Sequence, residues 1–120
     1  MTVLVVDDSQ LVRRQVVTAL TSHGFEAIEA VDGIDAQAKL GAHVALVICD
    51  LNMPRMNGLE LLAWMRETRS ETPFVMFSTD TNAEVAQRAK HLGAKAYLAK
   101  PFRAEVVVAV VEKLLGRRTE

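Results

Sequence analysis

The stretch Val44-Ala45-Leu46-Val47-Ile48-Cys49-Asp50 is an uninterrupted apolar run that ends in a carboxylate. Its β-branched residues favour a strand. Because no polar residues alternate with the apolar ones, we expect both faces of this strand to be buried, as in parallel sheets covered by helices. The run therefore predicts a central strand of an α/β fold from Val44 to Cys49, which leads into Asp50 at its carboxyl end.

Four other short apolar runs occur along the chain, and each of the five runs is followed by a segment with helical spacing. Val12, Val16 and Leu20 share one face of the first such segment, which His23-Gly24 ends. No hairpin signal joins the runs, so they predict a parallel sheet with helices on both faces. The four runs are Val3 to Val6, Phe25 to Ala30, Phe74 to Phe77 and Lys95 to Leu98.

Charged residues indicate which strands form the edges of this sheet. Glu26 and Glu29 lie in the second run and Lys95 in the fifth, whereas the first, third and fourth runs are apolar throughout. With right-handed crossovers, the simplest strand order is 2-1-3-4-5, the doubly wound flavodoxin-like α/β fold. In such sheets ligands bind at the carboxyl ends of the strands, where the chain direction reverses between strands 1 and 3.

The chain of 120 residues has the length of one domain, expected over 1–120 with a folded core at about 2–116. Its net charge is −1 and no face collects Lys or Arg, which argues against nucleic-acid and membrane partners. A lone cysteine, Cys49, and the lack of a leader before Val3 predict a cytoplasmic protein. No apolar run approaches the roughly 20 residues that span a bilayer.

Three carboxylates are expected to meet at the carboxyl edge of the sheet. The first strand runs into Asp7 and Asp8, and the third runs into Asp50. Like charges this close favour a bound cation, and oxygen ligands suit a divalent ion such as Mg²⁺. The alternative for the first pair is that Asp7 or Asp8 only caps the helix that begins near Ser9.

Two further polar groups follow neighbouring strands. Ser78-Thr79 ends the fourth strand, and Lys100-Pro101 follows the fifth. A hydroxyl and an ammonium at this edge suit a transferred phosphoryl group. Taken alone, Ser78 could be a turn former and Lys100 a solvated surface charge. They indicate a binding site because the ends of four strands, the first, third, fourth and fifth, are expected to lie close together.

Three strings of the sequence are informative together. In chain order they are Val5-Val6-Asp7-Asp8-Ser9, Cys49-Asp50-Leu51-Asn52-Met53-Pro54-Arg55-Met56-Asn57-Gly58 and Tyr97-Leu98-Ala99-Lys100-Pro101-Phe102. Strings of this kind in this order resemble the response-regulator receiver domains of two-component signalling, in particular the stand-alone chemotaxis type. The resemblance covers about Val3 to Leu115 and implies the flavodoxin-like fold as well.

The resemblance implies that a histidine kinase transfers a phosphoryl group to Asp50. Mg²⁺ would be held by Asp8, Asp50 and the backbone carbonyl of Asn52, with Asp7 acting directly or through water. Lys100 would pair with the phosphoryl oxygens. The domain would promote its own phosphorylation and dephosphorylation, as a switch and not as a turnover enzyme.

The resemblance also implies a switch in which Ser78 moves to the phosphoryl group and Tyr97 turns its ring inward. These movements would alter the surface made by the helix around Val85 to Leu92, the strand Lys95 to Leu98 and the helix around Val107 to Leu114. Because little chain follows that last helix, we expect output through a separate effector protein, and a homodimer is also open. Without the resemblance, Tyr97 would be an edge-strand aromatic packed on a helix.

The chain departs from the family pattern at the hydroxyl position. Ser78 stands where Thr is commoner, and Thr79 stands where a very small residue is usual, so Thr79 is expected to narrow access to Asp50. Asp80 and Asn52 would flank the route of the attacking water. The last helix is also unusual, because Val106 to Val111 is apolar nearly all round, which indicates either deeper packing or a partner surface.

Other functions remain as alternatives. A phosphotransfer intermediate or a constitutive scaffold would use the same fold. An aspartyl-phosphate phosphohydrolase would require a second acid at Asn52 and a cap domain. A flavin or nucleotide carrier would require a glycine-rich phosphate loop, and the chain has none.

Overall fold

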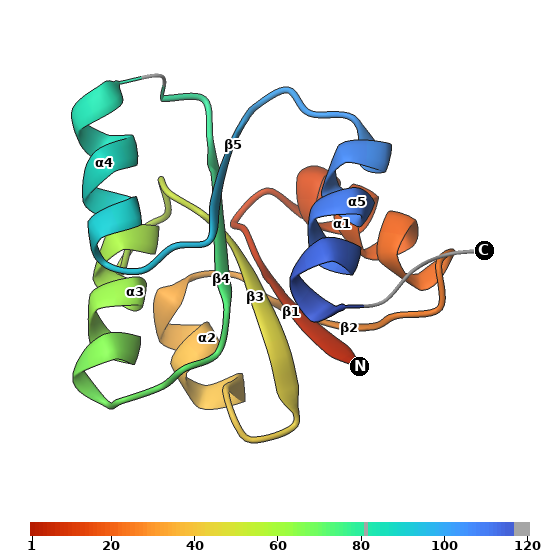
Figure 1. The fold of residues 1–120 in the computed structure, drawn as a ribbon, viewed down its shortest axis with the longest axis horizontal. Coiled ribbons are helices and arrows are strands. Elements are labelled where there is room, and N and C mark those ends of the chain that lie inside the picture. The colour runs from red at the N-terminus through yellow and green to blue at the C-terminus, as the bar shows by residue number, and fades with distance from the viewer. Residues whose placement is uncertain (81, 117–120) are drawn as a thin grey trace.

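The computed structural model describes residues 1–80 and 82–116, and the tail expected after the last helix lies outside them from residue 117 onward. Within the described residues, five strands alternate with five helices (Figure 1). The strands are β1 (Thr2–Val6), β2 (Glu26–Ala30), β3 (Val44–Asp50), β4 (Phe74–Ser78) and β5 (Ala96–Ala99). The helices are α1 (Gln10–Thr21), α2 (Gly33–Lys39), α3 (Gly58–Glu67), α4 (Ala83–His91) and α5 (Ala104–Leu115).

The strands form one parallel sheet in the order β2-β1-β3-β4-β5, which confirms the predicted flavodoxin-like arrangement. Each strand begins and ends within one residue of its predicted bounds. The edge strands are β2, which carries Glu26 and Glu29, and β5, which Lys95 directly precedes, and the central strands β1, β3 and β4 are buried along almost their whole length. Because all pairings are parallel, the five carboxyl ends lie at one edge of the sheet.

Helices cover both faces of the sheet, with α1 and α5 on one side and α2, α3 and α4 on the other (Figure 1). Successive residues of a strand point to opposite faces, so each strand contributes to two separate clusters of buried side chains. In β1, Val3 and Val5 pack with residues of α1 and α5, whereas Leu4 and Val6 pack with residues of α2, α3 and α4. The sheet is thus the shared wall between two apolar layers.

The valine-rich helix α5 is packed more deeply than a surface helix with one polar face. Val107, Val108 and Val111 are buried, and among the valines of its first half only Val106 is clearly exposed, at 42%. Most of the apolar surface of α5 is therefore used inside the domain, which favours the deeper-packing reading of this segment. No helix within residues 1–80 and 82–116 is long and apolar enough to cross a membrane.

Candidate functional site

Three carboxylates meet at the carboxyl edge of the sheet. Asp50 ends β3, and Asp7 and Asp8 follow β1, its neighbour in the sheet. One carboxylate oxygen from each of the three residues lies within 4.8 Å of the others. Asp7 is fully buried and Asp50 is 6% exposed, whereas Asp8 faces solvent. This acidic cluster is the one expected from the strand ends, and it is open to solvent on the Asp8 side.

The capping alternative for these aspartates is wrong, because the N-cap of α1 is Ser9. The Ser9 Oγ accepts a hydrogen bond from the backbone N–H of Val12 at 3.3 Å. Asp7 supports the turn one step earlier, since its Oδ1 accepts from the backbone N–H of Ser9 at 2.8 Å. The second oxygen of Asp7 is thereby left for the acidic cluster.

Lys100 is the positive charge of this site. Its Nζ lies 3.1 Å from Oδ2 of Asp7 and 3.2 Å from Oδ1 of Asp50. The ammonium also lies 4.8 Å from the centroid of the Phe77 ring, and its side chain is only 16% exposed. The backbone N–H of Lys100 donates to the carbonyl of Ser78 at 2.8 Å, and the Lys100-Pro101 peptide bond is cis. Lys100 is therefore held at the site from both its backbone and its side chain.

The charges of the cluster do not balance. Burial raises the pKa of Asp50, and the neighbouring carboxylate of Asp7 raises it further, while Lys100 lowers it and Asp8 raises it again. The net shift in the pKa of Asp50 is upward, because burial disfavours the charged carboxylate and Lys100 only partly offsets burial and the neighbouring carboxylates. A set of carboxylate oxygens with excess negative charge fits a hard divalent cation such as Mg²⁺.

Ser78 and Tyr97 are both bound to Asp80 in the segment after β4. The buried Ser78 Oγ accepts from the backbone N–H of Asp80 at 2.9 Å. The Tyr97 hydroxyl donates to the backbone carbonyl of Asp80, also at 2.9 Å. Tyr97 is half-buried, and Thr79 between the two hydrogen-bonded residues is exposed. One peptide segment thus connects the hydroxyl at the sheet edge with the aromatic residue of the edge strand.

The 52–57 loop carries the exposed Asn52 next to the cluster. Its base is closed by a hydrogen bond from the Gly58 N–H to the Leu51 carbonyl at 2.9 Å. Gly58 allows a close approach here, since a Cβ on it would lie 2.6 Å from the backbone oxygen of Asp50. At the far end Asn57 caps α3, and its side chain accepts from the Glu60 N–H at 2.8 Å.

The sequence analysis missed the arginines that hold the loops of this site. Arg13 donates from Nη1 to the backbone carbonyl of Asp7 at 2.7 Å and from Nε to Glu29 at 2.8 Å. Arg55 binds Asp32 in the loop before α2. The helical periodicity of α1, which places Arg13 in the first turn and six residues after Asp7, was the sequence signal that could have predicted the contact between Arg13 and Asp7. No sequence signal pointed to the second.

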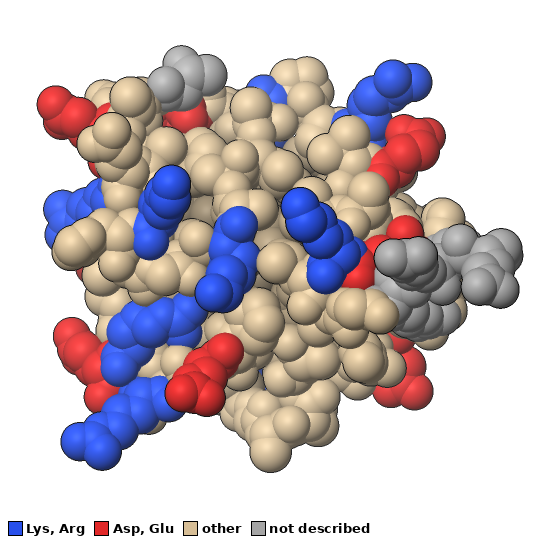
Figure 2. Space-filling model, in the orientation of Figure 1, with Lys and Arg blue, Asp and Glu red and all other residues tan. Residues whose placement is uncertain are grey.

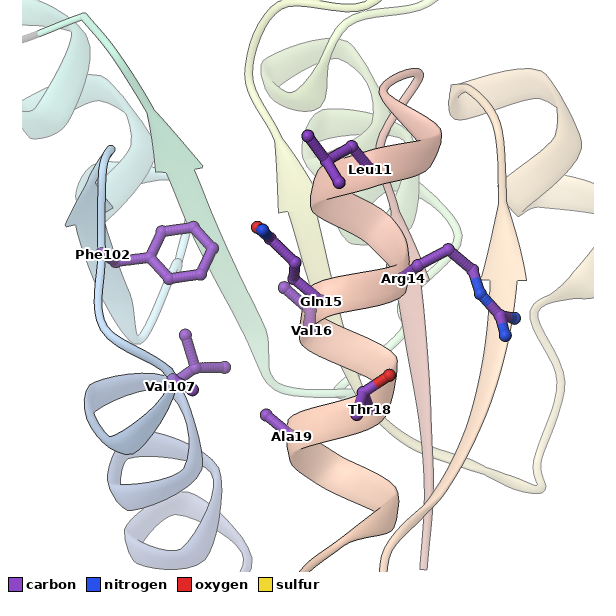
Figure 3. A pocket seen from close by; sticks show the side chains of 9 residues that line it. Leu11, Arg14, Gln15, Val16, Thr18, Ala19, Phe102 and Val107 are labelled. Atoms are coloured by element: carbon purple, nitrogen blue, oxygen red, sulfur yellow. The ribbon is translucent and has the colours of Figure 1, made fainter.

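A separate groove lies between α1 and α5, away from the carboxylates (Figure 3). Its volume is about 560 Å³, and its lining is mainly apolar. Leu11 and Val16 of α1 face Phe102 and Val107 across it (Figure 3). None of the three aspartates lines this groove, so it is distinct from the acidic cluster.

The sequence model of the protein family named response regulator receiver domain matches residues 3–112 of this chain. The chain belongs to this family. It is 36% identical over 121 residues to the chemotaxis protein CheY1 of Helicobacter pylori, covering 97% of this chain and 98% of that protein. It is 35% identical over 117 residues to the chemotaxis protein CheY of Treponema pallidum, covering 94% and 81%.

The solved structures agree with this assignment. A high-resolution structure of the chemotaxis protein CheY4 of Vibrio cholerae superposes with a TM-score of 0.88 at 37% identity, covering 95% of this chain and 98% of that one. The receiver domain described here is therefore a phosphorylation-controlled response regulator of two-component signalling, and a signalling protein as opposed to a turnover enzyme.

Proposed function

We propose that Asp50 is the phosphoacceptor of this receiver domain and that a histidine kinase is its phosphodonor. The observation that carries the proposal is the position of Lys100, whose Nζ contacts Asp50 and Asp7 together. A carboxylate oxygen of Asp50 attacks phosphorus, an O–P bond forms and the P–N bond to the donor imidazole breaks, with the electron pair returning to that nitrogen. Lys100 stands where negative charge on the transferred oxygens needs a partner.

We propose that Mg²⁺ is held by Asp7, Asp8 and Asp50 together with the backbone carbonyl of Asn52. The three carboxylates supply oxygens within 4.8 Å of one another. The ion would supply charge neutralisation at the phosphoryl oxygens when bound. Asp7 also orients Lys100, and the excess of carboxylates over ammonium groups supports a cation at this position.

The proposed switch passes through Asp80. If Ser78 turns its hydroxyl to a phosphoryl oxygen, the Asp80 N–H loses its acceptor. The carbonyl of the same residue accepts the Tyr97 hydroxyl, so a shift of this segment changes the hydrogen bond of Tyr97 as well. Tyr97 already lies half-buried in this structure, so we propose a change in its hydrogen bond alongside any turn of the ring.

The proposed output surface is made by α4, β5 and α5. Figure 2 shows Lys and Arg side chains across the middle of the face that carries these elements in Figure 1, and most Asp and Glu side chains nearer its rim. Arg88 and Lys90 are exposed in the last turn of α4, and Lys95 follows. The sequence-based expectation that no face collects Lys or Arg therefore does not describe this surface, where Arg88, Lys90 and Lys95 lie within eight residues of one another along the chain.

This surface would bind an effector protein, with residues 1–120 acting as one domain. We propose a cytoplasmic location, as expected from a chain with a single cysteine. A phosphotransfer intermediate would share the chemistry of Asp50 but would pass the phosphoryl group to another protein. The two functions differ in whether phosphorylation changes binding at the α4, β5 and α5 surface.

Intact-mass measurement tests the phosphoacceptor. Incubation with Mg²⁺ and a small acyl phosphate is expected to add one phosphoryl group to the wild-type chain and none to Asp50→Asn. The adduct should also be absent without Mg²⁺. Thr79→Ala is expected to react faster than wild type, because we propose that the β-branched side chain of Thr79, which is exposed beside Ser78, restricts the approach to Asp50. If wild type and Thr79→Ala both stay unmodified while folded, the scaffold alternative replaces this proposal.

A further inference from the structure

Arg55, at the tip of the 52–57 loop, has a left-handed backbone with φ of 68°. For a residue with a Cβ this conformation is unfavourable and persists only where surrounding contacts hold it. The side chain of Arg55 is 60% exposed, so burial of its own surface is not what holds it. Locally, the N–H of Met56 donates to the carbonyl of Pro54 at 2.8 Å and closes a tight turn around Arg55. The guanidinium group of Arg55 and the backbone of Met56 then connect this turn to another loop.

The guanidinium of Arg55 binds a buried carboxylate on a different loop. Its Nε and Nη2 lie 2.7 Å and 2.5 Å from Oδ2 of Asp32, whose side chain is only 5% exposed. The other oxygen of Asp32, Oδ1, accepts the backbone N–H of Asp35 at 2.8 Å and so caps α2. Both oxygens of Asp32 are thereby used, and without Arg55 its Oδ2 would keep its charge in a buried place with no cation beside it.

A backbone contact beside this ion pair joins the same two loops. The N–H of Gly33 donates to the carbonyl of Met56 at 3.3 Å. The two chains approach so closely that a Cβ on Gly33 would lie 2.6 Å from Cγ of Met56. The base of the 52–57 loop is fixed separately by the hydrogen bond between Gly58 and Leu51. The ion pair and this contact therefore fix the tip of a loop whose base is already closed.

We propose that Asp32 and Arg55 are positioning residues for the divalent-cation site, acting through the 52–57 loop. Asn52, whose backbone carbonyl is the proposed fourth ligand, begins this loop three residues before Arg55. Because the loop is fixed at its base and at its tip, the backbone carbonyl of Asn52 is oriented before a cation binds. The inference rests on the proposed function of the acidic cluster and extends it to two residues that touch neither the cation nor the phosphoryl group.

The test compares Mg²⁺ affinity, measured by calorimetry without any phosphodonor, in charge-neutral variants of the pair. Arg55→Gln removes the charge while keeping a polar, flexible side chain, although a shorter one, and Asp32→Asn keeps an oxygen that can cap α2. Each is expected to weaken Mg²⁺ binding about tenfold, the lower end of the range for groups that orient metal ligands. The double variant is expected to lose no more than either single variant, and Arg55→Lys is expected to recover part of the affinity.

Arg14→Gln is the matched control. Arg14 is also 60% exposed and also pairs with a carboxylate, Glu29, at 2.8 Å, but it does not contact the 52–57 loop. Its Mg²⁺ affinity should equal that of wild type. In the metal-free proteins, the amides of residues 52–57 should exchange with deuterium faster in Asp32→Asn and Arg55→Gln than in Arg14→Gln.

The inference is overturned if both charge-neutral variants bind Mg²⁺ within about a factor of two of wild type, a difference too small for a positioning role. It is equally overturned if their loop amides exchange as in Arg14→Gln. Failure of the proposed function gives a different result: no phosphoryl adduct forms on wild-type Asp50, although the variants still differ in Mg²⁺ affinity and in amide exchange.

Discussion

The ammonium group of Lys100 lies 3.2 Å from Oδ1 of Asp50, although the two residues belong to the ends of strands that are not neighbours in the sheet. The long lysine side chain reaches past the end of β4, with its ammonium 4.8 Å from the Phe77 ring centroid. The same ammonium contacts the fully buried Asp7. A single cation thus serves two buried carboxylates, and this imbalance has measurable consequences.

Asp50→Asn is expected to stabilise the metal-free protein by roughly 1 kcal/mol at pH 7, the ordinary size of a single-residue effect. Because burial and Asp7 raise the pKa of Asp50, its ionised form is less favourable in the folded than in the unfolded state. The destabilisation is present at neutral pH and is relieved as pH falls through the raised pKa.

Urea unfolding with a chelator, at pH 7 and at mildly acidic pH, checks this expectation. The advantage of Asp50→Asn should shrink toward acidic pH, and it should also shrink when Mg²⁺ is added, since the cation stabilises the wild type more. Equal stability of the two proteins at pH 7 without metal would contradict the described imbalance.

Lys100→Met is expected to destabilise the metal-free protein by about 2 kcal/mol. Removing the ammonium leaves Asp7 and Asp50 buried without their cation, and breaking a fully buried pair costs about 3–5 kcal/mol. The lower figure reflects the access of solvent on the side of Asp8. The double variant Lys100→Met/Asp50→Asn should recover part of the loss, which chemical denaturation of the four proteins measures as a coupling energy.

Tyr97→Phe is expected to separate phosphorylation from output. The substitution removes the 2.9 Å hydrogen bond to the Asp80 carbonyl, which should cost about 1 kcal/mol of stability. The Tyr97 hydroxyl does not contact the acidic cluster, so the rate of adduct formation by mass spectrometry should match wild type. Binding of an effector should respond less to phosphorylation, and a slower rate of adduct formation in Tyr97→Phe would argue against this separation.

Glu29→Gln is expected to lower stability by about 1–2 kcal/mol at pH 7, and the loss should vanish in acid. The hydrogen bond from Arg13 lowers the pKa of Glu29, burial raises this pKa, and Arg14 lowers it again. The pKa of Glu29 therefore lies below its usual value of 4.5. A lowered pKa gives stability that is complete above the usual value and is lost as pH falls through the folded pKa. Thermal unfolding of both proteins across this pH range measures the difference.

Raised salt provides the control for Glu29. The carboxylate and Arg13 are both partly buried, with side chains 28% and 11% exposed, so salt should screen their ion pair only weakly. The pair with Arg14, whose side chain is 60% exposed, should be screened more strongly. A stability difference between wild type and Glu29→Gln that disappears in salt would show that Arg13 contributes little.

The sequence alone determined the fold and the membership of the acidic cluster. Continuous apolar runs marked β1, β3 and β4 as central strands, and charge marked β2 and β5 as edges. These signals are readable because burial on one or both faces constrains every residue of a strand. Parallel strands then bring their ends to one edge whatever the loops do, so Asp7, Asp50 and Lys100 had to meet.

Only the tertiary structure decided which side chains hold the loops in place. The chain has 14 Lys and Arg against 15 Asp and Glu, so the sequence allows many pairings besides that of Arg55 with Asp32. It also allowed Asp7 or Asp8 to cap α1, a place that Ser9 takes. Such contacts depend on loop paths and on distances between segments far apart in the chain, which no local pattern of residues encodes.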